Sequence, residues 1–124
     1  MQSQVSSNLA QKTVCIVGGS GYTGTAIGQR ALKLGMKVIS VSRSGKPYYL
    51  KDLAGQENMR FEKGNPLTDP AALAPLLQES DLVVHCIGTL IEGKGEQSYD
   101  NMNRRALVEV ADQMQALSES SGRT

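Results

Sequence analysis

The chain has 124 residues, a formal net charge of +1 and 40% hydrophobic residues, which is the size and composition of one globular domain. No apolar run reaches the length of about 20 residues that a membrane-spanning helix needs, and the small net charge does not indicate a nucleic-acid partner. The charge is unevenly distributed, because residues 1–50 contain six basic residues and no acidic one. This distribution favours an anionic ligand near the N-terminal half, although solvated surface charge would explain it too.

The predicted elements start after a polar lead-in. Residues 1–12 are rich in Ser and Gln and match neither a secretory signal nor an Arg-rich presequence, so we predict a flexible segment. Cys15 and Cys86 lie inside predicted strands without the spacing of a metal site. They are therefore expected to be buried free thiols in a reducing intracellular compartment, and no metal site is predicted.

The stretch TVCIVGGSGYTG (13–24) carries the main functional signal. It predicts a buried strand at 13–17, a glycine turn and a helix that runs from about Tyr22 to Leu34. Three glycines at three-residue spacing occupy the turn: Gly18, Gly21 and Gly24. Glycines let the backbone approach a pyrophosphate, which the N-terminus of the helix then binds. The alternative is a tight turn that binds nothing.

The remaining pattern alternates strands and helices. We expect strands at 37–43, 59–63 and 81–88, a short helix at 48–55, a helix at 69–80 that Asp69 caps, a helix at 97–117 and a polar tail at 118–124. The long last helix should bury one face: Met102, Ala106, Val110, Met114 and Leu117. Right-handed crossovers then give an α/β fold of the Rossmann type, with a parallel sheet of order 3-2-1-4 and helices on both faces, in one domain over residues 13–117.

The predicted edge strand DLVVHCIG (81–88) is apolar on both faces. Natural sheets protect their edges with charge, proline or a covering element. The sequence therefore predicts an apparently incomplete sheet, in which residues 1–124 are the N-terminal part of a larger fold or in which a partner protein covers this edge.

The end of the second strand distinguishes the two nicotinamide dinucleotides. An NAD site places an acidic residue there, whereas an NADP site places an Arg. This chain has Ser42, Arg43 and Ser44, and its first acidic residue is Asp52. Arg43 could bind a 2′-phosphate with both hydroxyls donating to it, so NADP(H) is preferred and NAD(H) stays possible. The alternative is an exposed loop Arg.

Four segments together resemble an atypical short-chain dehydrogenase/reductase of the extended type: VCIVGGSGYTG, VISVSRSGKP, GNPLTDPAAL and DLVVHCIGTLIE. The second and fourth are similar to a mitochondrial branch with a member linked to coenzyme Q biosynthesis. More distantly, the chain resembles the NADPH-binding accessory subunit of respiratory complex I. The resemblance implies dinucleotide binding and a mitochondrial location.

The resemblance also implies roles for single positions. Ser20 belongs to the glycine turn, and Tyr22 and Thr23 would offer backbone N–H groups to the pyrophosphate. Asn65 would lie beside the adenine, in place of the family's usual acid. The end of the fourth strand would line the adenosine ribose: Cys86, Ile87 and Gly88.

The family's reductases use a Tyr-x-x-x-Lys pair, and this sequence has none, because no tyrosine is followed by Lys four positions later. His85 is the single histidine and is expected to be a core residue rather than a catalyst. No catalytic residue is assigned. The chain is interpreted as the cofactor-binding part of an NAD(P)-dependent reductase or as a non-catalytic accessory subunit of a larger complex.

Overall fold

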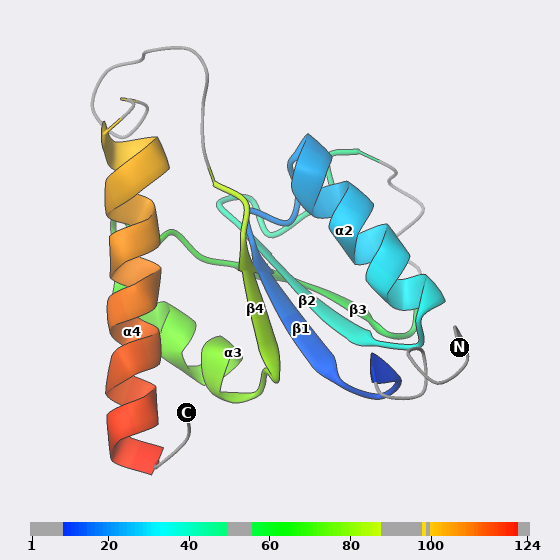
Figure 1. The fold of residues 1–124 in the computed structure, drawn as a ribbon. Coiled ribbons are helices and arrows are strands. Elements are labelled where there is room, and N and C mark those ends of the chain that lie inside the picture. The colour runs from blue at the N-terminus through cyan, green and yellow to red at the C-terminus, as the bar shows by residue number, and fades with distance from the viewer. Residues whose placement is uncertain (1–8, 50–55, 88–97, 99, 122–124) are drawn as a thin grey trace.

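A computed structural model describes residues 9–49, 56–87, 98 and 100–121. These residues form a four-stranded parallel sheet in the order β3-β2-β1-β4, which confirms the predicted topology. Helices cover both faces of the sheet (Figure 1). In chain order the elements are β1 (Thr13–Val17), α2 (Tyr22–Lys33), β2 (Lys37–Ser42), β3 (Met59–Lys63), the 3-10 helix η2 (Pro70–Leu73), α3 (Ala74–Gln78), β4 (Leu82–His85), the π-helix η4 (Asp100–Arg105) and α4 (Ala106–Ser121).

The sheet separates two apolar clusters, because successive side chains of a strand point to opposite faces. On the α2 face, buried residues include Val14, Ile16 and Val38. On the other face, Leu73, Leu77 and Val110 of η2, α3 and α4 pack against the alternate residues of β1 and β2, namely Cys15, Val17, Ile39 and Val41. The central strands are therefore buried on both faces, as their continuous apolar character predicts.

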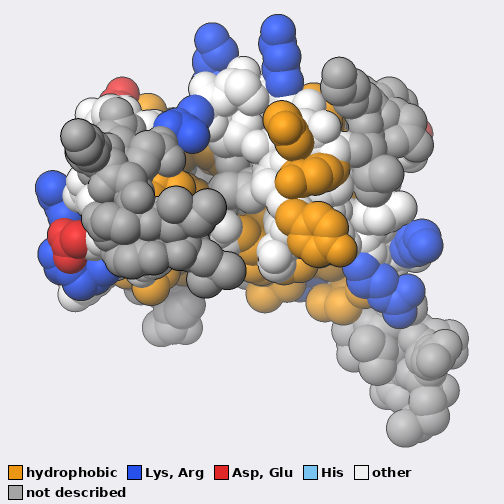
Figure 2. Space-filling model, turned by 90° about the horizontal axis from the view of Figure 1, so that it is seen from above, with side chains coloured by type: hydrophobic (Ala, Val, Ile, Leu, Met, Phe, Trp, Pro, Cys, Tyr) orange, Lys and Arg blue, Asp and Glu red, His pale blue; other side chains and the backbone are white. Residues whose placement is uncertain are grey.

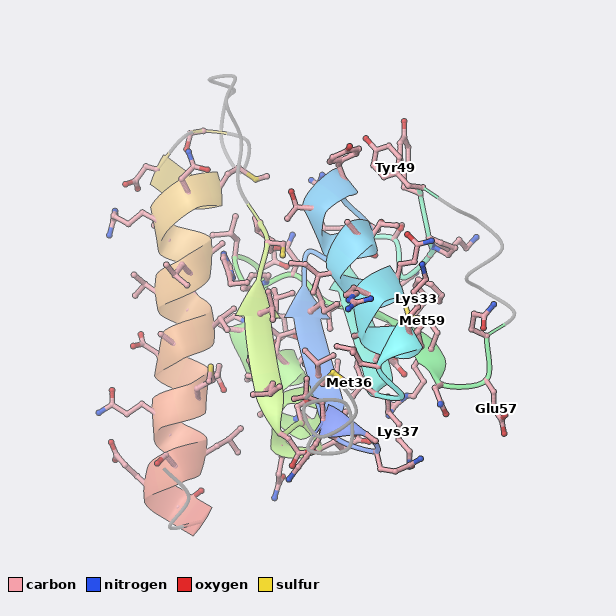
Figure 3. All side chains as sticks on the ribbon, turned by 45° about the vertical axis from the view of Figure 1, so that its right-hand side comes forward. Lys33, Met36, Lys37, Tyr49, Glu57 and Met59 are labelled. Carbon is pink, nitrogen blue, oxygen red and sulfur yellow. The ribbon has the colours of Figure 1, made fainter. Side chains whose placement is uncertain are left out.

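Helix α2 lies close to the sheet because small residues face it. Gly24, Gly28 and Ala31 are buried. Met59 of β3 lies beside α2 (Figure 3), and its methyl group would be 3.3 Å from a Cβ atom at Gly28. Ile27 and Leu34 are partly buried and pack against the same apolar cluster. The helix then ends before Gly35, whose φ of 81° is a conformation that glycine adopts without strain.

The later helices differ from the prediction in several details. Asp69 makes no side-chain cap, and the predicted helix is a 3-10 turn followed by the short helix α3. The last helix begins with the π-helical segment η4, and α4 then continues to Ser121, beyond the predicted end at Leu117. Its predicted buried face is only partly right, because Ala106 and Val110 are buried whereas Met114 is 42% exposed.

Strand β4 is the sheet edge in the described part of the chain, where it pairs only with β1. Its residues are less buried than those of β1, and Leu82 is 46% exposed. None of the described helices combines the length and the apolarity that a membrane crossing requires. The predicted helix at 48–55 falls mostly outside the described residues, and Tyr48 and Tyr49 lie in a bend rather than a helix.

Candidate functional site

The glycine turn lies between the ends of β1 and β2. Gly18 has a φ of 91°, and the N–H groups of Gly18 and Gly19 both donate to the carbonyl of Val41, at 2.8 and 3.0 Å. A Cβ atom at Gly18 would approach the backbone of Cys86 and Ile87 to 2.9 Å. The turn therefore lies against the carboxyl ends of β2 and β4, where only a residue without a side chain fits.

Gly21 and Gly24 are glycines for different reasons. A Cβ atom at Gly24 would collide with the carbonyl oxygen of Gly18 and lie 2.8 Å from Cα of Gly19. At Gly21 a Cβ atom would meet only the Gly18 carbonyl at 3.6 Å, and the φ of −74° suits any residue. The fold thus requires a glycine at position 24 but leaves open space at position 21, directly at the N-terminus of α2.

The N-terminus of α2 is suited to an anion. Gly21 is the N-cap residue and supplies no side-chain cap, and the first turn contains no acidic residue. The first N–H groups of a helix have no partner within the helix, and the helix dipole adds partial positive charge there. The face of the molecule that carries the strand ends shows more Lys and Arg than Asp and Glu side chains among its described residues (Figure 2). Both features favour a negatively charged group beside Gly21.

A cleft of about 210 Å³ opens at the carboxyl ends of the strands, beside the N-terminus of α2. Its predicted site residues are Gly18, Ser20, Gly21, Ser42, Arg43, Asn65, Cys86 and Ile87, and its other lining residues are Gly64, Pro66, Leu67, Met102 and Ala106. Tyr22, Thr23, Gly24 and Ser44 do not line it, and Gly88 lies outside the described residues. Sites for whole cofactors typically measure about 300–1,000 Å³, so the described residues enclose only part of such a site.

The loop after β2 places Arg43 at the cleft. The Ser42 hydroxyl accepts the Gly45 N–H at 3.0 Å, and the Ser44 hydroxyl donates to the Lys46 carbonyl at 3.4 Å and accepts the Lys46 N–H at 3.2 Å. Both hydroxyls therefore shape the turn, and their donation to a phosphate stays a prediction. The Arg43 side chain is exposed at the rim of the cleft.

The opposite wall comes from the turn after β3. The Asn65 side-chain oxygen accepts the Leu67 N–H at 3.0 Å, and its backbone carbonyl accepts the N–H groups of Thr68 and Asp69. Asn65 thus fixes the turn that leads into η2, in addition to lining the cleft. Met102 and Ala106 were not predicted as site residues, because only the packing of α4 against η2 and α3 brings them to the cleft.

Two titratable side chains lie near the end of β4. Burial raises the pKa of the Cys86 thiol, so the group stays protonated at neutral pH. Burial lowers the pKa of His85, an effect that a nearby backbone group of Ile87 partly offsets. Neither ring nitrogen makes a hydrogen bond of good geometry, and His85 does not line the cleft. His85 is thus half-buried rather than a core residue, and its burial favours the neutral form of the ring. Among the described residues, no cluster of His, Cys, Asp and Glu could hold a metal ion.

The model of the NAD dependent epimerase/dehydratase family matches residues 14–118. The chain belongs to this family. The match runs from β1 into α4 and contains the glycine turn, both walls of the cleft and the β4 edge. The match supports the predicted Rossmann fold of the extended short-chain dehydrogenase/reductase type.

The relatives that this chain matches are longer than the chain itself. The chain is 31% identical over 98 residues to MIOREX complex component 2 of Saccharomyces cerevisiae, and the match covers 72% of the chain but 35% of the yeast protein. A short chain dehydrogenase from Leptospira borgpetersenii with bound NAD+ superposes with a TM-score of 0.75 at 16% identity, covering 96% of the chain and 50% of that structure. Bordetella bronchiseptica WbmH in complex with NAD+ superposes with a TM-score of 0.69 at 22% identity, covering 86% and 36%. The chain thus spans half or less of these relatives.

Proposed function

We propose that this chain binds a nicotinamide adenine dinucleotide at the carboxyl edge of its sheet, with the pyrophosphate at the N-terminus of α2. The observation that carries the proposal is the open space at Gly21, which the fold does not require to be a glycine. A phosphate group would fill that space and accept hydrogen bonds from the N–H groups of the first helical turn. Membership of an NAD-dependent family and the NAD+ in both superposed structures support this proposal.

We further propose that NADP(H) is the preferred cofactor, with NAD(H) as a weaker ligand. Arg43 lies where β2 ends and lines the cleft, and residues 9–49 contain no acidic side chain that could bind a ribose 2′-hydroxyl. A guanidinium can bind a 2′-phosphate through two parallel hydrogen bonds. The superposed structures hold NAD+, so the preference rests on Arg43 and not on them.

Replacing Arg43 tests this preference. Arg43→Ala should weaken NADPH binding by about ten- to a hundredfold, because a charge-assisted hydrogen-bond pair to the 2′-phosphate is lost. The affinity for NADH should change by less than about threefold, because NADH lacks that phosphate. Both dissociation constants can be measured by titration of the nucleotide's fluorescence.

Lys46→Ala is the matched control. Lys46 is an exposed cation of the same loop that does not line the cleft, so its removal should affect both nucleotides only slightly. Equal losses of NADPH and NADH affinity in Arg43→Ala would contradict the assigned 2′-phosphate contact. Failure of the unaltered protein to bind either nucleotide would contradict dinucleotide binding itself.

The role of the bound nucleotide has two candidates. In the first, the whole protein is a reductase, and the nicotinamide supplies hydride when it is bound. In the second, it is an accessory subunit whose nucleotide stabilises an assembly. The yeast relative's name as a complex component favours the second. NADPH that survives purification and is not consumed by carbonyl or quinone substrates would support the subunit role, and turnover would support the reductase.

We also propose that another segment or a partner protein covers β4. Its outer edge has no paired strand among the described residues, and an apolar surface groove continues from it to α2, lined by Val14, Ile27, Leu34, Leu82 and Val84 among others. A mitochondrial location stays a prediction from the family resemblance.

A further inference from the structure

Gly19 lies between two elements that come from different parts of the chain. Below it is Ser40 of β2, whose hydroxyl would collide with a Cβ atom at Gly19 and whose own Cβ would lie 2.9 Å from that atom. Above it is α2, because a Cβ atom at Gly24 would reach Cα of Gly19 at 2.8 Å. The Thr25 hydroxyl also donates to the Gly19 carbonyl, at 3.4 Å. The peptide at Gly19 is thus packed tightly on both sides.

The hydroxyl group of Ser40 does not stabilise the core through a hydrogen bond. Its side chain is fully buried, and its oxygen has no hydrogen-bond partner in the part of the chain that the structure describes. An unpaired buried hydroxyl is unfavourable for folding. Val38, two residues earlier on β2 and therefore on the same face of the sheet, is larger and also buried. What distinguishes position 40 is its small volume directly under Gly19.

We propose that Ser40 is a positioning residue of the dinucleotide site: its small volume sets how closely the glycine turn approaches the sheet. This inference rests on the dinucleotide binding proposed above. A larger side chain would push Gly19 away from β2, and the turn cannot move toward α2, because Gly24 already fills that direction. The whole turn, with Gly21 and the N-terminus of α2, would then shift relative to the cleft. Anion binding at a helix N-terminus depends on the positions of these N–H groups.

Two substitutions at Ser40 in the full-length protein separate volume from hydrogen bonding. Ser40→Ala keeps the space and removes the hydroxyl, so NADPH affinity should stay within about twofold of that of the unaltered protein. Ser40→Val adds volume under Gly19, so the affinities for NADPH and NADH should both fall by about tenfold or more. Val38→Ile is the control, because it enlarges a buried side chain on the same strand and the same sheet face, away from the turn.

The amide resonances of Gly18, Gly19, Gly21 and Gly24, observed with glycine-selective ¹⁵N labelling, give a second readout that needs no ligand. Their chemical shifts should change in Ser40→Val and stay unchanged in Val38→Ile. A general loss of stability would change the chemical shifts in both variants. Unchanged glycine resonances in a folded Ser40→Val protein would overturn the proposal, as would a tenfold loss of affinity in Ser40→Ala. If the unaltered protein binds no dinucleotide, the proposed function fails, but the resonances still decide whether Ser40 positions the turn.

Discussion

Gly21 and Gly24 are three residues apart, and the structure predicts opposite results for replacing them. Gly24→Ala should lower the free energy of unfolding by about 1–3 kcal/mol, because the added methyl group meets the backbone of Gly18 and Gly19. Gly21→Ser should leave that free energy unchanged or raise it by a few tenths of a kcal/mol, because serine is a favoured N-cap residue. Urea denaturation measures both values.

Nucleotide binding completes this comparison. Gly21→Ser should weaken NADPH binding by about tenfold or more, because its side chain occupies the space proposed for the pyrophosphate. A stable Gly21→Ser protein that binds NADPH normally would contradict the proposed position of the phosphate groups. Stability and affinity should thus respond at different glycines of one motif.

His85 should make the stability depend on pH. Burial lowers its pKa in the folded state below the ordinary value of 6.5, so the unfolded chain takes up a proton that the folded protein resists. Its contribution is fully present above pH 6.5 and is lost as the pH falls through the lowered pKa. The slope it adds is at most about 1.4 kcal/mol per pH unit. Denaturation at several pH values between 5 and 7.5 should show a flatter dependence for His85→Leu than for the unaltered protein, and identical slopes would contradict the prediction.

At the scale of elements, the turn before η2 differs from the prediction. The predicted side-chain cap is absent, and a side-chain hydrogen bond that was not predicted holds the turn instead. Asp69 precedes Pro70 in the pattern of a helix start, but it makes no side-chain cap. Asn65 instead accepts the Leu67 N–H and holds the turn. Asn65→Ala should therefore lower the free energy of unfolding by about 1 kcal/mol, and Asp69→Ala by less than about 0.5 kcal/mol. Thermal or chemical denaturation of the pair checks this, and a larger effect at Asp69 would show that the sequence pattern was the better guide.

These cases show which features the sequence determines. The strands Thr13–Val17 and Met59–Lys63 and the start of α2 were predicted at their observed positions, because β-branched runs and glycines act locally. The order of the sheet followed from the alternation of elements. The contact of Gly19 with Ser40 and the approach of Met102 to the cleft were not predicted, because each joins segments distant in sequence. Met114 fits the helical period of the buried face, yet it is 42% exposed, because it lines an open groove together with Leu77 and Val83.

At the scale of the whole molecule, the exposed side of β4 is the feature that the described residues leave unexplained. Exposed apolar patches and unpaired strand edges promote association, and natural proteins cover or charge them. Here Leu82 is 46% exposed beside an apolar groove, and the relatives are two or more times as long as this chain. If the cover proposed for β4 is present, Leu82 is buried beneath it.

Leu107 of α4 provides a matched comparison, because it is 47% exposed but lies away from this groove. If an additional element covers β4, Leu82→Asp should lower the free energy of unfolding of the complete protein by about 2 kcal/mol or more, since it places a charge in an apolar contact. Leu107→Asp should change it by no more than about 0.5 kcal/mol, as surface substitutions usually do. Urea denaturation of the full-length variants measures both. Equal, small effects would mean that β4 is a true solvent-exposed edge, and the cover proposed for it would have to be abandoned.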